Sequence, residues 1–179
     1  LEKAYAQLAG IGWIGKNSLL INREAGSWVF LGAILTPLSL AFDEPGLDHC
    51  GSCTRCLDAC PTDAFPSPYV LDARRCIATW TIESAKPLDV IVPEELGQHV
   101  FGCDICQEVC PWNRKASLSD HEPLLPRPEN VRPALDPLTG MTDSEFRSRF
   151  PGSAVRRTDA SRLGSVAQLI LQRDDGEES

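Results

Sequence analysis

Eight cysteines are the residues of this 179-residue chain whose type and spacing most clearly carry chemistry. Seven of them fall in two runs, and each run ends in Cys-Pro. The first run is Cys50-x-x-Cys53-x-x-Cys56-x-x-x-Cys60-Pro61, a spacing typical of the thiolate ligands of 4Fe-4S clusters. Three closely spaced thiolates can hold one face of a cubane cluster, while the fourth turns toward a neighbouring cluster. This run therefore predicts iron-sulfur chemistry with a second cluster nearby.

The second run, Cys103-x-x-Cys106-x-x-x-Cys110-Pro111, repeats the back half of that pattern and lacks its first cysteine. Cys76 lies outside both runs and is available to supply the missing thiolate. In the crossed arrangement of two-cluster bacterial ferredoxins, each run lends its last cysteine to the other cluster. This arrangement predicts two ligand sets: Cys50, Cys53, Cys56 and Cys110 for one cluster, and Cys60, Cys76, Cys103 and Cys106 for the other.

Zinc and disulfide bonds are the alternatives for these cysteines. Two structural zinc sites would also use eight thiolates, but zinc ribbons pair two Cys-x-x-Cys knuckles and do not need a three-plus-one run ending in Cys-Pro. Disulfide frameworks rarely carry this density of Cys-x-x-Cys spacings, and the chain shows no secretory signal. Iron-sulfur clusters are favoured, with zinc as the main alternative. Thiolate-bound clusters imply a reducing compartment, so we expect a cytoplasmic location.

The composition places few limits on the partners. With 42% hydrophobic and 23% charged residues the chain is typical globular material, and no apolar run is long enough to span a membrane, so no membrane partner is expected. The net charge is -8, but four of the acidic residues lie in the last six positions, and basic pairs occur elsewhere. Overall charge therefore neither requires nor excludes a nucleic acid.

Short elements are predicted before the cysteines. Leu1, Tyr5 and Leu8 stand at helical spacing and predict an amphipathic helix at the start of the chain. Two strands are predicted at 19–22 and 27–36, joined by a short turn. The second of these strands is too apolar to face water.

A glycine cluster follows the first helix. Gly10-x-Gly12-x-x-Gly15-Lys16 matches the dinucleotide fingerprint and, except at Asn17, a phosphate loop. Both mechanisms need a strand before the glycines and a helix after them, so that the helix N-terminus faces phosphate. The predicted order is the reverse, which argues against a nucleotide site. Two interpretations of the glycines remain: a structural turn, or main chain that another large ligand approaches closely.

The region after the cysteines is predicted to be a linker and two helices. Five prolines between residues 123 and 137 predict an extended linker that cannot be helical. Thr142-x-x-Glu145 predicts a capping box for a short helix that ends near residue 150. A last helix is expected around residues 163–170, after Asp159 or Ser161 as its cap.

Five blocks, taken in order and spacing, resemble the epoxyqueuosine reductase family, and the similarity runs from about residue 1 to residue 157. The last block is the most specific of them. The blocks are AGIGWIGKNS at 9–18, GSWVFLG at 26–32, the first cysteine run, CIxxxTIE at 76–83 and FGCDICQEVCPWN at 101–113.

The resemblance implies an oxidoreductase that reduces epoxyqueuosine in tRNA to queuosine, with electrons passing through two 4Fe-4S clusters to a cobalamin. It implies an α+β chain: part of a cobalamin-binding α/β domain at 1–45, a ferredoxin-like two-cluster domain at 46–122, and a Pro-rich linker with a helical tail at 123–179. The implied partners are the anticodon arm of a queuosine-type tRNA and a one-electron donor such as a ferredoxin or flavodoxin. We expect a monomer.

The resemblance also suggests site residues. Corrin contacts are expected at Lys16, Asn17, Ser27, Trp28, Thr81, Glu83 and Asp104, although a solvated lysine, a core tryptophan and a surface glutamate would look the same in sequence. Arg74 and Arg75 flank Cys76 and are candidate contacts to tRNA phosphates, or simply exposed side chains. The family's proton-donating acid lies upstream of Leu1, so no catalytic acid is named. The chain is therefore expected to be a fragment lacking the amino-terminal part and inactive alone, and its tail after Thr158 departs from the family.

Two other functions stay open. One is a cobalamin-dependent enzyme of the reductive dehalogenase kind, against which the 101–113 block argues. The other is a ferredoxin-type electron-transfer module that binds no corrin. A cobalamin-binding experiment would separate the second from an epoxyqueuosine reductase.

Overall fold

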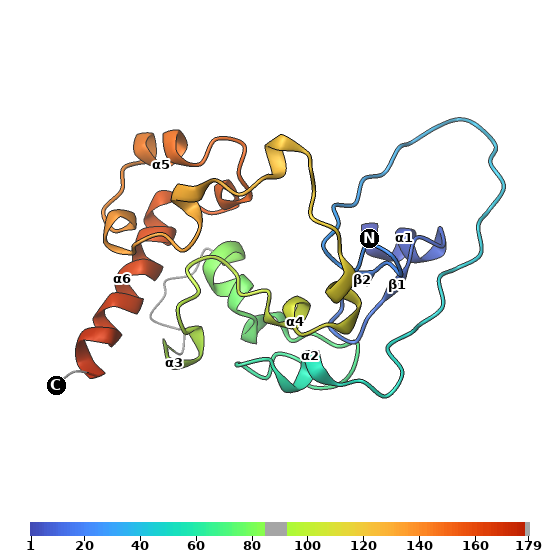
Figure 1. The fold of residues 1–179 in the computed structure, drawn as a ribbon, viewed down its shortest axis with the longest axis horizontal. Coiled ribbons are helices and arrows are strands. Elements are labelled where there is room, and N and C mark those ends of the chain that lie inside the picture. Colours follow the sequence, from blue (N-terminus) through green and yellow to red (C-terminus); the bar gives the residue numbers. More distant parts are fainter. Residues whose placement is uncertain (85–92, 178–179) are drawn as a thin grey trace. The chain divides into compact units, whose positions relative to one another are not determined.

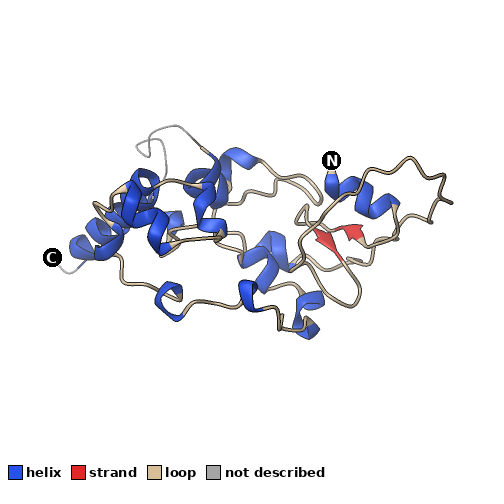
Figure 2. Cartoon of the chain, turned by 90° about the horizontal axis from the view of Figure 1, so that it is seen from above, coloured by secondary structure: helices blue, strands red, loops and turns tan. Residues whose placement is uncertain are grey.

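The computed structural model describes residues 1–84 and 93–177, which cluster into two compact units (Figure 1). Unit 1 comprises residues 1–72 and 104–118, and unit 2 comprises residues 73–103 and 119–179. The chain thus passes from one unit to the other three times, and these boundaries differ from the predicted domains. Helices dominate, with one small sheet, so the mixed class is right at the coarse level (Figure 2). None of the helices in the described ranges has the length and apolar character needed to cross a membrane.

Unit 1 is built on a two-stranded sheet. Helix α1 (Glu2–Leu8) leads to β1 (Trp13–Ile14), which pairs antiparallel with β2 (Leu20–Ile21) so that Trp13 lies opposite Ile21. Short helices α2 (Arg55–Asp58) and α4 (Ile105–Glu108) follow the first cysteines of each run and contact each other. The small core contains Trp13, Ile21 and Cys110, with Cys50 and Trp112 packed against it. One cysteine from each run therefore takes part in the core of this unit.

The predicted strand at 27–36 is wrong. The sheet partner of β2 is β1, and only an isolated bridge from Asn22 to Gly26 follows it. Residues 28–36 carry no strand, and the side chains of Phe30 and Leu35 are 85% and 98% exposed. An apolar pattern predicts burial, but a strand also needs a partner for its main-chain hydrogen bonds, and none of the described segments pairs with this one.

The predicted first helix is confirmed, but its apolar face is wrong. Leu1, Tyr5 and Leu8 are exposed, and Ala6 is the buried residue of α1. The face of α1 that contacts the rest of unit 1 carries Gln7. The Gln7 side-chain oxygen accepts the Ile14 amide at 2.9 Å, and its main-chain oxygen accepts the Gly46 amide at 2.8 Å. A small residue beside these bonds lets the main chain approach the helix closely, which hydrophobic spacing cannot reveal.

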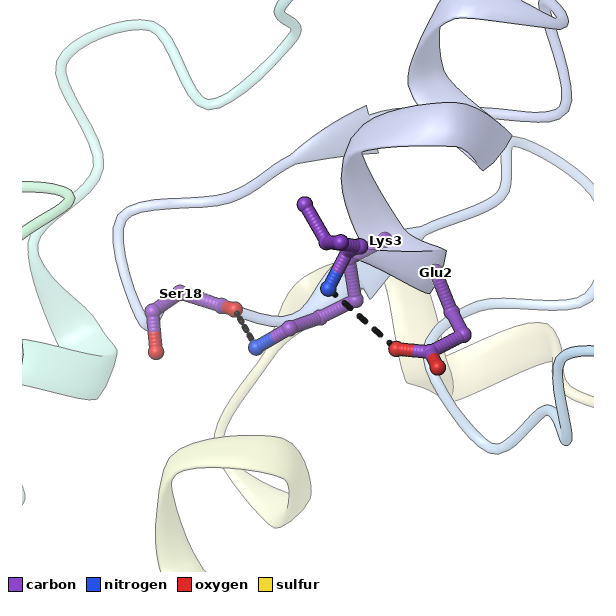
Figure 3. A network of polar contacts seen from close by, with 4 residues as sticks. Glu2, Lys3 and Ser18 are labelled. Atoms are coloured by element: carbon purple, nitrogen blue, oxygen red, sulfur yellow. Dashed lines mark hydrogen bonds and ion pairs between the residues drawn. The ribbon is translucent and has the colours of Figure 1, made fainter.

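The exposed start of α1 is held by charged groups (Figure 3). The Lys3 ammonium donates to the main-chain oxygen of Ser18 at 2.7 Å, and the amino terminus pairs with Glu2 at 3.3 Å. Ser18 has a positive φ of 61°, so this bond fixes the loop between β1 and β2 at its most constrained residue.

Unit 2 is helical. After a short 3-10 turn (Ala73–Arg75) and a π-helical turn (Thr79–Glu83), it contains α3 (Pro93–Leu96), α5 (Asp143–Arg149), a 3-10 turn (Ala154–Arg157) and the long α6 (Ala160–Glu177). The predicted last helix is confirmed, and the Asp159 carboxylate accepts the Arg162 amide at 2.8 Å at its start. Helix α6 contributes to two apolar clusters, one with Leu138 and Phe146 and one with Ile77 and Leu96. The carboxyl-terminal helix is therefore a core element of unit 2.

The proline-rich region contains short turns. Three 3-10 turns occur, each with a proline in its first two positions: Glu122–Leu124, Pro128–Asn130 and Asp136–Leu138. The prediction of no α-helix holds, but the prediction of a wholly non-helical stretch is wrong. Proline lacks only an N–H that the first helical turn does not use, and its φ suits that turn.

The predicted capping box of α5 is confirmed and gives a stability prediction. The Thr142 hydroxyl accepts the Glu145 amide at 3.3 Å, and the Glu145 carboxylate accepts the Thr142 amide at 2.8 Å. Thr142→Ala should lower the free energy of unfolding by about 1 kcal/mol, because the cap is lost. Thr142→Ser keeps the cap and should stay close to the wild type in urea denaturation. Equal stability of all three proteins would contradict this role.

Candidate cluster-binding site

A cavity of about 590 Å³ in unit 1 is lined by the four cysteines of the first predicted ligand set: Cys50, Cys53, Cys56 and Cys110. Local structure explains the grouping of the first three. The Cys53 amide bonds to the Cys50 oxygen at 3.1 Å, and α2 begins two residues later, so that Cys56 lies on its first turn. Cys110 comes from the other run, in the turn that follows α4. The fold thus brings together thiols from two runs far apart in sequence.

The thiols of this set act on one another. Burial raises the pKa of the Cys56 and Cys110 thiols, and negative charge on Cys50 and Cys53 raises it further. Among the described residues, no three His, Cys, Asp or Glu side chains converge as ligands of a single metal ion. A cubane takes one thiolate at each of four irons, so its ligands are spread around a cube, and four thiols around one cavity suit it.

The wall of the cavity carries positive charge. Besides the cysteines, its titratable lining residues in the described chain are all basic: Lys16, Arg23, His49, Arg55 and Lys115. A 4Fe-4S cluster with four thiolates carries net negative charge, and cations that line the same cavity would stabilise it. The donor set and the charge of the wall therefore both fit such a cluster.

A buried indole packs next to these cysteines. Trp13 is only 2% exposed, packs with Cys50 and Cys110, and makes edge contacts with His49 and Trp112 at 5.0 Å between ring centroids. Within the part of the chain that the structure describes, its ring N–H has no hydrogen-bond partner. That atom has almost no accessible surface, and Trp13 does not line the cavity, so its contribution is packing behind the cysteines. Sequence reasoning missed this packing role, although Trp13 lay in the 9–18 block.

Two polar residues of the glycine cluster tie the cysteine segments together. The Lys16 ammonium donates to the main-chain oxygens of Gly51 (2.6 Å) and Cys53 (2.9 Å). The Asn17 amide donates to the Cys106 oxygen at 3.2 Å, and both side chains line the cavity. These residues, predicted as corrin contacts, lie beside the cysteines of unit 1.

The Cys50 end of the loop is fixed by Asp48. Its carboxylate accepts the Cys50 amide at 2.8 Å and the Tyr69 hydroxyl at 2.5 Å. Burial alone would raise the pKa of Asp48, but these two bonds and the Lys16 charge lower it on balance. The same hydrogen bond raises the pKa of Tyr69 to about 12, so that Tyr69 stays protonated. Asp48 is therefore an anion that holds the loop in place.

The glycines serve as a structural turn. The order helix, glycines, strand is confirmed, since α1 precedes and β2 follows them. A Cβ at Gly12 would lie 2.2 Å from the Ile21 oxygen, and one at Gly46 would lie 1.9 Å from the Gly12 oxygen. The close approach that these glycines allow is thus between segments of the chain itself.

Ser27 belongs to a network with two residues that the sequence did not single out. Its amide donates to the Asn113 side-chain oxygen at 2.7 Å, and its hydroxyl donates to the Gln107 side-chain oxygen at 2.9 Å. The Asn113 amide group donates to the Ser27 hydroxyl and to the Gln107 main-chain oxygen. Asn113 and Gln107 stand in the 101–113 block, so the block itself was the available signal.

Asn113→Ala should destabilise unit 1. The change removes three hydrogen bonds and leaves the partly buried Ser27 amide without its acceptor, so we expect the free energy of unfolding to fall by about 2–4 kcal/mol. Arg114→Ala, at the next and exposed position, should change it by less than about 0.5 kcal/mol. Urea denaturation of both variants measures these free energies of unfolding. An equal loss in Asn113→Ala and Arg114→Ala would show that the network does not stabilise unit 1.

The remaining predicted contacts are not among the residues that line this cavity. Trp28 is half exposed, and Asp104, with a φ of 52°, accepts the Gln107 side-chain amide at 2.8 Å. In unit 2, Thr81 is fully buried: its hydroxyl donates to the Ile77 oxygen and accepts the Gly102 amide, both at 2.9 Å. Glu83 pairs with Arg157. Thr81 and Glu83 thus already have partners within unit 2.

The other predicted metal and nucleic-acid residues fall in both units. In unit 1 the Cys60 sulfur accepts the Ala64 amide at 3.3 Å. In unit 2 Cys103 packs against the core that contains Ile77, and Arg74 and Arg75 form an exposed 3-10 turn before Cys76. The second ligand set takes two cysteines from each unit and remains a prediction from the sequence.

Comparison with known proteins gives consistent similarities. Residues 49–113 match the family described as the 4Fe-4S double cluster binding domain. The chain is 46% identical to the epoxyqueuosine reductase of Synechocystis sp., over 96% of the chain and 60% of that protein. It is 48% identical to the enzyme of Gloeobacter violaceus, over 95% of this chain and 55% of that protein. It is 45% identical to the enzyme of Escherichia coli, over 88% of this chain and 41% of that protein.

Solved structures are similar over the same extent. An epoxyqueuosine reductase from Bacillus subtilis has a TM-score of 0.89 at 37% identity, covering 96% of this chain and 46% of that one. A crystal structure of epoxyqueuosine reductase with an epoxyqueuosine-modified tRNA-Tyr stem loop also has a TM-score of 0.89 at 37% identity. The match covers 96% of this chain and 45% of that one. The chain thus spans about half the length of these relatives.

Proposed function

We propose, since the chain belongs to the epoxyqueuosine reductase family, that it is the electron-transfer part of an enzyme that reduces epoxyqueuosine in tRNA to queuosine. The observation that carries the proposal is the cavity in unit 1, where thiols from two separate cysteine runs meet behind a basic wall. Removal of the epoxide oxygen as water takes two electrons and two protons, and 4Fe-4S clusters can deliver the two electrons one at a time.

The cysteines would hold two cubane clusters in the crossed arrangement. The first would be bound by the four cysteines of the cavity, and the second by Cys60, Cys76, Cys103 and Cys106. When bound, such clusters supply one-electron transfer, and a corrin supplies the strong reductant that acts on the substrate. The second set is proposed from the sequence spacing alone.

The chain's own residues would bind and shield the first cluster. Trp13 and Trp112 pack around Cys50 and Cys110 and keep water from that side. Lys16 and Asp48 fix the loop from residue 48 to residue 53 by hydrogen bonds to its main chain. Rigid ligands favour fast electron transfer, because little rearrangement accompanies the change of charge.

Cobalamin is proposed from the resemblance alone. Of its predicted contacts in unit 1, Lys16 and Asn17 line the cysteine cavity, whereas Ser27, Trp28 and Asp104 do not. We assign none of these residues a part in the reduction. Trp28 and Asp104 remain proposed contacts.

The substrate partner is proposed to be tRNA. A relative of similar fold is known with an epoxyqueuosine-modified tRNA stem loop. Arg74 and Arg75 are exposed, and arginine side chains at such positions can bind phosphate oxygens. A cytoplasmic location and a small external one-electron donor follow from the same proposal.

The function can be tested in a bacterium that lacks its own epoxyqueuosine reductase. The complete gene that encodes this chain should convert epoxyqueuosine in the cell's tRNA to queuosine, as measured by mass spectrometry of tRNA nucleosides. The same gene with Cys53→Ser should leave epoxyqueuosine in place. Unchanged epoxyqueuosine with the wild-type gene, in cells whose purified protein contains iron and sulfide, would overturn the proposal.

An electron-transfer module without corrin is the second candidate. The observation that favours it is that Lys16 and Asn17, two of the predicted corrin contacts, instead donate hydrogen bonds to the main chain of the cysteine segments. Cob(II)alamin added to the cluster-loaded product of the complete gene separates the two: retention of corrin through gel filtration supports the reductase, and complete separation supports the carrier.

A further inference from the structure

We propose that Lys16 is a positioning residue for the first cluster, which both fixes the loop that carries Cys50 and Cys53 and raises the reduction potential of the cluster they bind. The proposal rests on the assignment of a 4Fe-4S cluster to the cavity in unit 1. It gives Lys16 a role different from the corrin contact that the resemblance suggests.

The geometry of the Lys16 ammonium supports the first part. It donates to the Gly51 oxygen at 2.6 Å and to the Cys53 oxygen at 2.9 Å, and so bridges the turn between the first two cysteines. Gly51 has a φ of 52°, which glycine adopts without strain, so the two bonds from Lys16 select one conformation of a turn that could adopt several. Lys16 itself is held, because its main-chain oxygen accepts the Tyr69 amide at 3.0 Å.

Burial of Lys16 supports the second part. The residue is only 9% exposed, and it lines the same cavity as the four cysteines. A buried ammonium without a carboxylate bound to it is uncommon, and among the described residues the acceptors of the Lys16 ammonium are two neutral carbonyl groups. Its charge is therefore not cancelled by a direct ion pair and acts on the thiolates through a medium of low dielectric constant.

Other charges around the cavity modify this effect without reversing it. The Asp48 carboxylate acts on Lys16 and offsets part of its charge. Arg23, Arg55 and Lys115 also line the cavity, but all three are exposed, so that water and salt screen them more strongly. Lys16 is the buried cation of this wall and should have the largest effect of the four.

The charge of Lys16 affects how readily the first cluster accepts an electron. Reduction adds one negative charge to a cluster that is already negative, and a nearby positive charge stabilises the reduced state more than the oxidised state. Loss of the Lys16 charge should therefore make the first cluster harder to reduce. The same loss should loosen the Gly51–Cys53 turn and slow cluster uptake.

Lys3 offers a matched control. Its ammonium also donates to a main-chain oxygen, that of Ser18 at 2.7 Å, and it belongs to the same unit (Figure 3). Lys3 is exposed and does not line the cavity. Lys3→Met removes the same charge and a similar bond away from the cysteines.

The test is a redox titration of the cluster-loaded chain followed by electron paramagnetic resonance, with the first-cluster signal identified by its loss in Cys53→Ser. For Lys16→Met, we expect the ratio of reduced to oxidised first cluster at a fixed ambient potential to fall about tenfold, which corresponds to about 59 mV for one electron. Lys16→Arg, which keeps charge and donors, and Lys3→Met should both stay within about twofold of the wild type.

Each outcome decides the proposal. Loss of the first cluster in Lys16→Met, with retention in Lys16→Arg, would also support the positioning role. A wild-type titration curve for Lys16→Met, an equal shift in Lys3→Met, or loss of the cluster in both Lys16 variants would overturn it. If the wild-type chain takes up no cluster, the proposed function itself fails, which is a separate and recognisable result.

Discussion

A chain in which Cys50 and Cys110 are both replaced by serine is expected to keep one of its two clusters. The two residues come from different runs, but they line one cavity and belong to one proposed ligand set. Iron should fall from about eight to about four atoms per chain, because both substitutions affect the same cubane. Iron and acid-labile sulfide in the anaerobically reconstituted protein measure this.

The matched control is the pair Cys50 and Cys60, which belong to the same run. In the crossed arrangement these cysteines hold different clusters, so the double substitution should remove both and leave almost no iron. An uncrossed arrangement reverses the two results: the same-run pair would leave about four irons, and the pair Cys50 and Cys110 would leave none. That reversal would refute the ligand sets, whereas single substitutions could not distinguish them.

Ile170→Ala is expected to have the largest effect on stability. Ile170 is 1% exposed in α6 and packs in a cluster with Ile77, Leu96 and Val166. Truncation leaves a cavity in a core that supports the chain next to Cys76, so the free energy of unfolding should fall by about 2–5 kcal/mol. Guanidinium denaturation followed by circular dichroism measures the loss.

Gln168→Ala is the control for this change, because Gln168 lies on the exposed face of the same helix. It should shift the free energy of unfolding by less than about 0.5 kcal/mol. A small effect of Ile170→Ala would contradict the assignment of α6 to the unit 2 core.

Features set by local sequence could be predicted. The capping box at Thr142 and Glu145 and the Asp159 cap depend on a few adjacent residues, and the structure has both. The order of helix, glycines and strand was likewise correct, and it argued against a nucleotide loop. Local signals of this kind carry their own partners with them.

Features set by distant partners could not be predicted. The strand expected at 27–36 lacks a neighbour in the described chain, and the face of α1 that packs is chosen by main-chain bonds to Gln7. Hydrophobic periodicity reports which side chains would favour burial, and it says nothing of whether a surface to cover them exists. Tertiary context therefore decided both elements.

The candidate site shows the same division. The four cysteines of the cavity were predicted from their spacing, since cluster ligation imposes that spacing directly. The supporting residues Gln107 and Asn113 were not, because a hydrogen bond across eighty or more residues leaves no periodic trace. The packing of Trp13 against Cys50 and Cys110 is likewise a contact between distant segments. Lys16 was singled out, but its contacts with Gly51 and Cys53 became visible only in the fold.

Iron, inorganic sulfide and zinc counted on the anaerobically purified chain test most directly whether its cysteines bind paired cubane clusters. About eight irons and eight sulfides per chain, with little zinc, are the expected result. About two zinc ions without sulfide, or thiols lost to disulfides in place of bound iron, would contradict the account at its base.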